Sequence, residues 1–320
     1  MTARNHHFVS QCYLRGFTHG GTRQSTFEVF DRERSKQYTQ RPRKVGYEYD
    51  FNTVDIAGLT PDALEQAIAN FEGEFSKSLK RIIEAGNLDN EEDRVYLLNF
   101  ISMLAVRNPR MRKMLVGMKE QTMRIMAEAM VSSKQMYESQ IAGATAAGYV
   151  EPDHDVTYEQ MKDFVKRGEY DIVVPREDSI LREFDAQPAV LECLIDRKWS
   201  IIRAHGNTGF VSSDHPVCLH WQKPPPPSIF NSPGFGLTGT DVIFPISKSL
   251  LAVGRFEGNA EVIDANQRTT AHLNSIVASH ASTQIYAADG QPLFRQLDGT
   301  IVEGAAILQQ QFFQKHKLKD

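Results

Sequence analysis

Residues 5–17, with the sequence NHHFVSQCYLRGF, carry the clearest indication of how this chain folds. The segment holds four large apolar side chains, Phe8, Val9, Tyr13 and Leu14, close to the start of the chain. Chain termini are usually poorly ordered unless they are docked, and a mobile terminus does not need this much apolar surface. We therefore expect residues 5–17 to be packed into the body of the protein.

The rest of the chain has the composition of an ordinary soluble protein. With 320 residues, 41% hydrophobic and 24% charged, it is long enough to bury a core without disulfides or metals. The three cysteines, Cys12, Cys193 and Cys218, are too few for a secreted disulfide framework, and their odd number would leave a free thiol. No signal-peptide pattern and no apolar run of membrane-spanning length is present. We expect a cytoplasmic protein that does not cross a membrane.

Charge is distributed in blocks along the chain, whose formal net charge is −4. Residues 1–50 hold nine Lys and Arg against five Asp and Glu, a net charge of +4, and residues 101–150 also carry +4. Residues 51–100 and 151–200 each carry −6, and the remainder is balanced. Such blocks are typical of helices with solvated charged faces, and we favour that interpretation over a dedicated anion-binding groove.

Two long helices are predicted in the first half of the chain. Apolar residues recur at three-to-four spacing after Thr60 and Pro61, which we interpret as an N-cap and a first-turn proline, and Gly86 stops the run. A second helix begins near Asn90 as its cap, and Pro109 must kink or break it. The pattern beyond Pro109 is rich in methionine, for which we favour core packing over a ligand or partner surface.

Strands are predicted on both sides of these helices. Residues 26–30 alternate and are followed by a polar turn and a return strand at 36–39, which predicts a short hairpin. After Trp199 several short apolar runs separated by Gly, Asn, Asp and Pro predict strands, with one helix between 264 and 279. Strands grouped after helices predict an α+β fold, with a short N-terminal hairpin and helical bundle-like part followed by a mostly antiparallel sheet part with one or two helices.

Two segments of unusual composition mark the organisation of the chain. GATAAG at 143–148 is interpreted as a small-residue linker. It divides a helical region, 1–150, from a strand-rich region, 151–320, and we expect the two to pack together as one unit. The proline run at 224–227 is interpreted as a stiff polyproline II spacer.

The first group of candidate functional residues lies in the opening segment. His6 and His7 are adjacent, so they cannot share one face of a strand, but either has the chemistry of a ligand or general base. Gln11 and Arg15 follow within one or two turns. Structural histidines held by hydrogen bonds are the alternative interpretation.

The second group lies on the predicted helices. Glu65 and Glu72 are seven residues apart, at the edge of the apolar stripe. Arg107 follows Leu104 by three residues, so its guanidinium projects from an apolar face and needs a partner. We expect Glu65 and Glu72 to supply it, either as a buried structural pair or as part of a pocket for an anionic group.

The third group lies in FVSSDHPVCLHW, residues 210–221. In extended geometry Asp214, Cys218 and His220 share one face, and His215 takes the other unless the segment turns there. None of the compact zinc spacings is present. Asp214 is therefore interpreted as a general base, a metal-binding carboxylate or a turn-forming cap.

Six motifs in order, from NHHFVSQCYLRGF and LEQAIANFEGEF through FISMLAVRNPRMR, GFVSSDHPV and VIFPIS to HLNSIVASHAS, resemble the bacterial domain of unknown function 4238 family. The resemblance spans nearly the whole chain. Ser10 stands where the family often has proline, and Cys12 where an aromatic residue is common. The resemblance implies that the functional positions are His7, Gln11, Arg15, Glu72, Arg107, Asp214, Pro216, Pro245 and Asn274.

Our first hypothesis is a hydrolase acting on a phosphate-bearing or nucleic-acid substrate. Catalysis is assigned to His7, Glu72 and Asp214, with Asp214 and Glu72 as ligands of a divalent metal ion. Substrate binding is assigned to Gln11, Arg15, Arg107 and Asn274.

Two other classes of function remain open from the residues alone. The alternative is a non-enzymatic binding module of a defence or mobile-element locus, whose polar residues form a structural ion-pair network. A further hypothesis is a basic surface over residues 101–124 that binds nucleic acid without cutting it. Across these hypotheses, nucleic acid or a nucleotide is the candidate partner.

Overall fold

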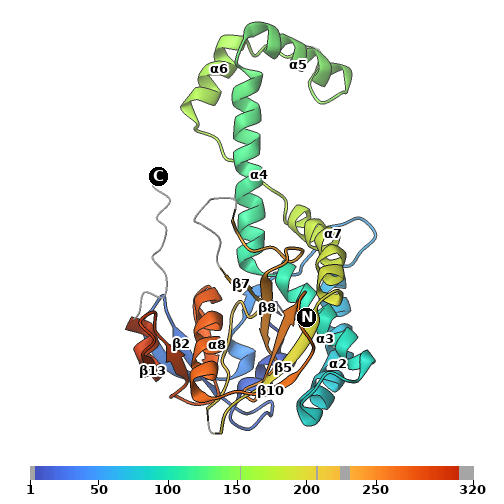
Figure 1. The fold of residues 1–320 in the computed structure, drawn as a ribbon. Coiled ribbons are helices and arrows are strands. Elements are labelled where there is room, and N and C mark those ends of the chain that lie inside the picture. Colours follow the sequence, from blue (N-terminus) through green and yellow to red (C-terminus); the bar gives the residue numbers. More distant parts are fainter. Residues whose placement is uncertain (1–3, 152, 207, 224–230, 310–320) are drawn as a thin grey trace. The chain divides into compact units, whose positions relative to one another are not determined.

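The computed structural model describes residues 4–151, 153–206, 208–223 and 231–309 (Figure 1). Helices and several sheets form the described chain, which confirms the predicted α+β class. The proline run at 224–227 lies outside the described residues. Among the described helices, none combines the length and apolar composition needed to cross a membrane.

The chain forms two compact units. One consists of Met1–Pro109 with Ile180–Asp320, and the other of Arg110–Ser179. The predicted regions 1–150 and 151–320 divide the chain differently and stay a prediction.

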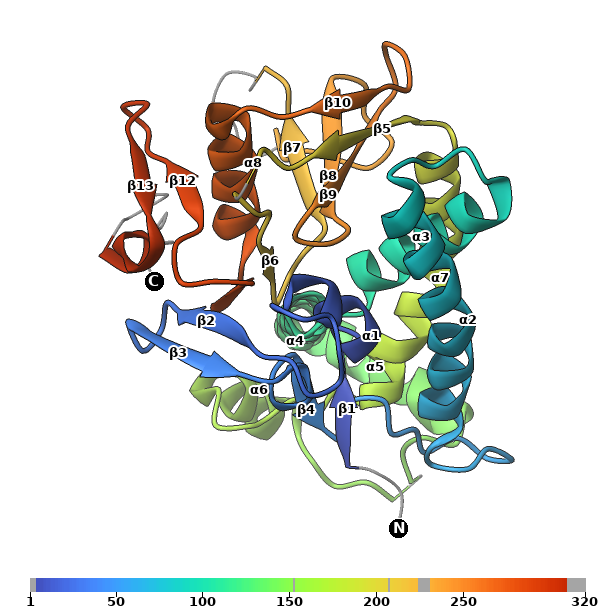
Figure 2. The same cartoon turned by 90° about the horizontal axis from the view of Figure 1, so that it is seen from below.

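The opening segment is packed into the larger unit, as its apolar residues predict. It forms β1 (Asn5–His7), the short helix α1 (Gln11–Leu14) and the 3-10 turn η1 (Arg15–Phe17). Tyr13, Leu14 and Phe17 have no exposed surface. In Figure 2, α1 lies near the middle of the view, between the strand β6 and the helix α2.

Tyr13 is the centre of this packing. Its ring centroid lies 5.5 Å from that of Phe100 and 5.2 Å from that of Phe244. Its hydroxyl donates to the carbonyl oxygen of Pro245 and lies 2.8 Å from the hydroxyl oxygen of Ser212. Because a phenol in an apolar core needs a hydrogen-bond partner, this side chain joins the opening segment to β6 (Ser212–Ser213) and β8 (Thr240–Pro245).

The two predicted long helices are present as α2 (Ala63–Ala85) and α3 (Glu91–Val106), which pack together. Gly86 ends α2 in the left-handed region, at φ 65°, which glycine adopts without strain. The Asn90 side chain accepts the backbone N–H of Asp93 and caps α3 as expected.

The predicted N-cap at Thr60 is wrong. The Ala63 backbone N–H donates to the Thr60 carbonyl, which closes a turn before the helix, and α2 begins at Ala63. At Pro109 the prediction is correct, since α3 ends at Val106 and α4 (Pro109–Met130) begins at the proline.

The favoured packing role for the methionines is also wrong. Met114, Met118 and Met126 on α4 are 50%, 59% and 61% exposed. The smaller unit is built mainly from α4, α5 (Lys134–Ala146) and α6 (Tyr158–Arg167), and these few helices do not surround α4. The GATAAG sequence forms the last turn of α5 and the residues that follow it.

The predicted hairpin is confirmed as β2 (Phe27–Asp31) and β3 (Lys36–Gln40). It belongs to a four-stranded sheet of order β3-β2-β11-β6, in which β11 (Gln284–Ala287) pairs with β2 antiparallel. The predicted late helix is α8 (Gln267–His280), which packs against β12 (Leu293–Arg295).

A five-stranded sheet has the order β10-β5-β9-β8-β7, and all its pairs are antiparallel except β10 with β5. Its remaining strands are β5 (Lys198–Arg203), β7 (Cys218–Trp221), β9 (Leu250–Arg255) and β10 (Val262–Asp264). The other elements are η2 (Pro42–Lys44), β4 (Tyr47–Tyr49), α7 (Arg176–Ile195), β13 (Ile301–Glu303) and η3 (Gly304–Gln309).

We expect Tyr13→Phe to lower the free energy of unfolding by about 1–3 kcal/mol, because it keeps the ring but removes the donor to Pro245 and the partner of Ser212. Chemical denaturation measures the change. Tyr149→Phe is the matched control, since Tyr149 is 87% exposed, and should alter stability by less than about 0.5 kcal/mol. Equal stability of the two variants would contradict the role of the hydroxyl.

Candidate functional site

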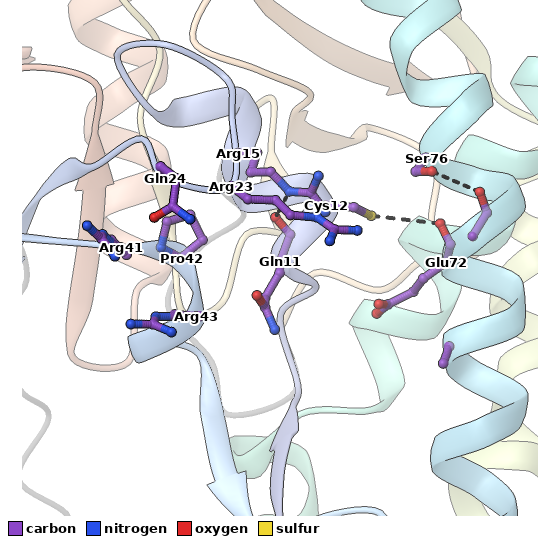
Figure 3. Close-up of a pocket in the computed structure, with 12 residues that line it drawn as sticks. Gln11, Cys12, Arg15, Arg23, Gln24, Arg41, Pro42, Arg43, Glu72 and Ser76 are labelled. Carbon is purple, nitrogen blue, oxygen red and sulfur yellow. Dashed lines mark hydrogen bonds between the residues drawn. The ribbon is translucent and has the colours of Figure 1, made fainter. Parts of the chain in front are cut away.

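A cavity of about 550 Å³ lies beside the opening segment. This volume falls within the range of small-molecule sites. Its walls come from α1 and η1, from α2, from the loop before β2 and from the turn at η2 (Figure 3). The lining residues are Gln11, Cys12, Arg15, Arg23, Gln24, Arg41, Pro42, Arg43, Ala69, Glu72, Gly73 and Ser76.

Four arginines define the electrostatics of this cavity: Arg15, Arg23, Arg41 and Arg43. Arg15 donates from Nε to the carbonyl oxygen of Gln11 at 3.3 Å. Within the described ranges, none of the four makes an ion pair with a carboxylate. Their charges therefore remain available to an anionic ligand.

The turn that carries Arg41 and Arg43 is fixed against the opening segment. The backbone N–H groups of Phe8 and Val9 both donate to the carbonyl oxygen of Gly46, at 2.9 and 3.1 Å. Gly46 has φ 63°, and a Cβ there would lie 3.2 Å from that of Val9. Glycine is needed at position 46, because a side chain there would be strained at this φ and would crowd Val9. The close approach that glycine allows holds the basic turn beside α1.

Glu72 is the one acidic side chain among the described residues that line the cavity. Burial raises the pKa of Glu72, while the nearby charges of Arg107 and Arg15 oppose that rise. Burial also raises the pKa of Cys12 to about 11, so its thiol stays protonated near pH 7. The carboxyl group of Glu72 is thus the candidate proton-transfer group of the cavity.

Arg107 is buried beside the cavity and holds a polar network together. It donates from Nη1 to the carbonyl oxygen of His7 at 3.2 Å and lies 3.4 Å from Oδ1 of Asn52. Asn52 in turn donates to Glu65 at 2.6 Å. Asn52 therefore links Arg107 to Glu65 by hydrogen bonds, and the charge of Arg107 lowers the pKa of Glu72. It also lines a smaller cavity of about 200 Å³ with apolar residues of α2 and α3.

The two histidines of the opening segment are held by the fold. Nδ1 of His6 accepts the backbone N–H of Asn52 at 2.9 Å. Nδ1 of His7 lies 3.4 Å from Nε2 of Gln11, and burial lowers the pKa of His7 to about 4. The His7 imidazole is therefore neutral at pH 7 and contacts the cavity through Gln11.

Asp214 lies elsewhere and has a different environment. Its two oxygens accept the backbone N–H groups of Ser282, Thr283 and Gln284 and the hydroxyl of Thr283, at 2.7–3.0 Å. Burial raises the pKa of Asp214, and these hydrogen bonds oppose the rise. The carboxylate fastens the start of β11 to the turn after β6.

The extended strand envisaged through Asp214, Cys218 and His220 is interrupted. The chain leaves β6 after Ser213 and re-enters a strand only at Cys218, so Asp214 lies in the intervening turn. Asp214 therefore does not share one strand face with Cys218 and His220. The alternative that the segment turns here matches the structure.

Asn274 is also used by the fold. Its Oδ1 accepts the backbone N–H of Val211, and its Nδ2 donates to the carbonyl oxygens of Gly209 and Leu293. Pro245 accepts the Tyr13 hydroxyl, and Pro216 accepts a hydrogen bond from Cys218. These positions stabilise strand ends and lie outside the walls of the arginine-lined cavity.

The sequence-assigned site is thus divided in space. Gln11, Arg15 and Glu72 line one cavity, with His7 and Arg107 next to it, whereas Asp214 and Asn274 do not line it. Over the described ranges, no group of three or more His, Cys, Asp and Glu residues is placed to hold a metal ion. The assignment of Asp214 and Glu72 to one metal site stays a prediction that this geometry does not support.

Sequence reasoning did not identify Arg23, Arg41 and Arg43. Their signal was present in the net charge of +4 over residues 1–50, which holds all four arginines of the cavity. That block was interpreted as a solvated surface, because the pattern of charge along a chain does not show which side chains converge.

Fold and site together define an α+β protein in which a docked N-terminal segment, a long helix and a basic turn enclose an arginine-lined cavity. A family model described as "Protein of unknown function (DUF4238)" matches residues 5–291, and the chain belongs to this family. All the cavity residues fall within the matched region. Neither a curated protein nor a solved structure matches the chain significantly.

We expect Asp214→Ala to lower the free energy of unfolding by about 3 kcal/mol or more, because it leaves three backbone N–H groups and one hydroxyl without their acceptor. Thermal and chemical denaturation measure the loss. Asp185→Ala, at an exposed position of α7, is the control and should change stability by less than about 0.5 kcal/mol. If Asp214→Ala were as stable as this control, the structural role of Asp214 would be contradicted, and Asp214 would again be a candidate catalytic residue.

Proposed function

We propose that the arginine-lined cavity binds a phosphate-bearing ligand. The observation that carries this proposal is that four arginines, without ion-pair partners among the described residues, line one cavity that contains a single carboxyl group. Like charges gathered in this way repel one another, and a bound anion removes that repulsion. The arrangement supports a ligand with several anionic oxygens.

Phosphate suits this arrangement better than a single carboxylate does. Each guanidinium presents a planar fork of N–H donors that matches two phosphate oxygens. Arg15 comes from η1 and Arg23 from the loop before β2, and Figure 3 shows their guanidinium groups close together on the side toward Glu72. Arg41 and Arg43 lie on the other side of the cavity and are directed away from Glu72. Donors that come from different elements can bind different oxygens of one tetrahedral group.

We expect Arg15→Gln to weaken the binding of inorganic phosphate by about 10-fold or more, because a hydrogen bond to a charged group contributes roughly 1.5–3 kcal/mol. Isothermal titration calorimetry measures the dissociation constant. Arg268→Gln, at an exposed position on α8, is the matched control and should bind as the wild type does. Similar affinities for the two variants, or no phosphate binding by the wild type, would refute the proposal.

We also infer that the site hydrolyses a phosphate ester, with Glu72 as its general acid. Burial raises the pKa of Glu72, and its carboxyl group lies in the same cavity as the arginines. Water would attack phosphorus, the bond from phosphorus to the ester oxygen would break, and Glu72 would give its proton to that oxygen. Of the two protons of the attacking water, one would stay on the phosphate as a P–O–H group, and the other would pass through solvent to restore Glu72.

We expect Glu72→Gln to lower kcat for ester hydrolysis by about 10²–10⁴-fold with little change in KM, because it removes the proton and keeps the shape. Steady-state phosphate release measures both constants. Glu74→Gln is the control: Glu74 lies two residues further along α2 and pairs with Lys77 outside the cavity. Equal kcat values for the two variants would remove Glu72 from catalysis.

The non-enzymatic binding module remains the second candidate. It is favoured by the hydrogen-bonded network of the buried residues His6, Asn52 and Arg107 with the partly exposed Glu65. Phosphate binding by a wild-type protein that hydrolyses no ester would decide for the module.

Of the basic surface proposed over residues 101–124, residues 101–108 are buried, which confines any such surface to α4.

We place the protein in the cytoplasm as part of this proposal. Cys12, Cys193 and Cys218 are free thiols. Free thiols are maintained in a reducing compartment, which supports this location.

A further inference from the structure

A second cavity, of about 530 Å³, adjoins the arginine-lined one. Cys12, Arg15 and Ser76 line both, so the two spaces meet at these three residues. The second cavity extends over α2, the turn after η1 and the turn between β8 and β9. Its other lining residues are Gly16, Thr18, His19, Gly20, Gly21, Leu79, Lys80, Ile83, Glu84, Ser247, Lys248 and Ser249.

The two cavities differ in charge. The lysines of the second cavity already have partners: Lys248 donates to the carbonyl oxygen of His19 at 2.8 Å, and Lys80 lies 3.7 Å from a carboxylate oxygen of Glu84. Ile83 contributes aliphatic surface beside the nearly buried Leu79. A second phosphate therefore finds fewer available cations here than in the first cavity, whereas an uncharged group finds apolar surface.

The wall opposite α2 is held in place by hydrogen bonds and by a close backbone approach. Thr18 donates its hydroxyl to the carbonyl oxygen of Arg15 and accepts the backbone N–H of Gly21. A Cβ on Gly16 would lie 3.2 Å from that of Ser247, so this wall packs tightly on the turn between β8 and β9. The cavity is therefore formed in the folded chain before any ligand binds.

Hydroxyl groups stand on the same side as that turn. The side-chain oxygens of Ser247 and Ser249 lie 3.0 Å apart; Ser249 is exposed, whereas Ser247 is buried behind it. Hydroxyls of this kind both donate and accept hydrogen bonds. Aliphatic surface on one wall and hydroxyls on the other suit a flat heterocycle joined to a sugar.

We propose that the ligand is a nucleotide, with its phosphate in the arginine-lined cavity and its nucleoside in the second cavity. This inference rests on the proposed function, since it assigns the organic part of the same phosphate-bearing ligand. Arg15 stands where the two parts join, because it lines both spaces. Inorganic phosphate would fill only the first cavity, and a polyphosphate would place charge against Leu79 and Ile83.

The test compares inorganic phosphate with the monophosphates of adenosine, guanosine, cytidine and uridine, by isothermal titration calorimetry on the full chain. We expect at least one nucleotide to bind about 10-fold more tightly than phosphate, because burial of the nucleoside adds to the binding free energy. Ser249→Trp would fill the second cavity. We expect it to bring the ratio of the dissociation constant for phosphate to that for the nucleotide down to about one.

Ser139→Trp is the matched control, since Ser139 is exposed on α5 and lines neither cavity. It should keep the wild-type ratio. Ile83→Ala is an independent variant that removes aliphatic surface without filling the space, and it should also lower the ratio. This second variant keeps the inference testable if the tryptophan at 249 disturbs folding, which thermal denaturation reports.

Phosphate binding with no tighter binding of any of the four nucleotides would overturn this inference and leave the proposed phosphate site standing. A nucleotide preference that survives both Ser249→Trp and Ile83→Ala would also overturn it, since the nucleoside would then bind elsewhere. Absence of phosphate binding would instead refute the proposed function itself.

Discussion

The buried hydroxyl of Tyr13 is the contact on which the rest of the larger unit depends. A phenol with no exposed surface must be hydrogen-bonded, and its partners, Ser212 and Pro245, lie about two hundred residues further along the chain. The ring packs between Phe100 of α3 and Phe244 of β8. One side chain thus ties the opening segment to a helix and two strands, with directional contacts as well as apolar ones.

The candidate site is a consequence of that docking. Once Tyr13 fixes α1, Gln11 and Arg15 face α2, and the two hydrogen bonds to Gly46 bring Arg41 and Arg43 to the same space. The arginines are therefore assembled by backbone contacts of the opening segment. The packing of that segment offsets the electrostatic repulsion among the arginines. The fold can therefore hold these charges near one another without carboxylate partners within the described chain.

Glu72 and Arg107 show how burial and charge compete at this site. Burial disfavours the ionised form of Glu72, and the two nearby arginines favour it, with burial the larger effect. Arg107 is drawn toward His7 and Asn52 at the same time. A carboxyl group whose pKa is raised by burial and lowered by nearby arginines is sensitive to the charge of whatever occupies the cavity beside it.

The sequence pattern predicted the helices and the hairpin whose formation depends on neighbouring residues. The spacing of apolar residues and the caps at Gly86 and Asn90 predicted α2 and α3, and the turn after Phe30 predicted the first hairpin. The apolar content of residues 5–17 predicted docking, and proximity along one segment brought Gln11 and Arg15 together. The error at Thr60 arose because a turn and the first turn of a helix use the same residue types.

By itself, the sequence determined the α+β class, the long helices and the docking of the opening segment, since periodicity and apolar content are properties of neighbouring residues. Only the tertiary structure decided what the polar residues do. Asp214 and Asn274 have the residue types of a site, yet their partners are backbone groups at strand ends. Arg23, Arg41 and Arg43 have no motif, yet they line one cavity with Arg15, because the lining of a cavity depends on where distant backbone segments are fixed.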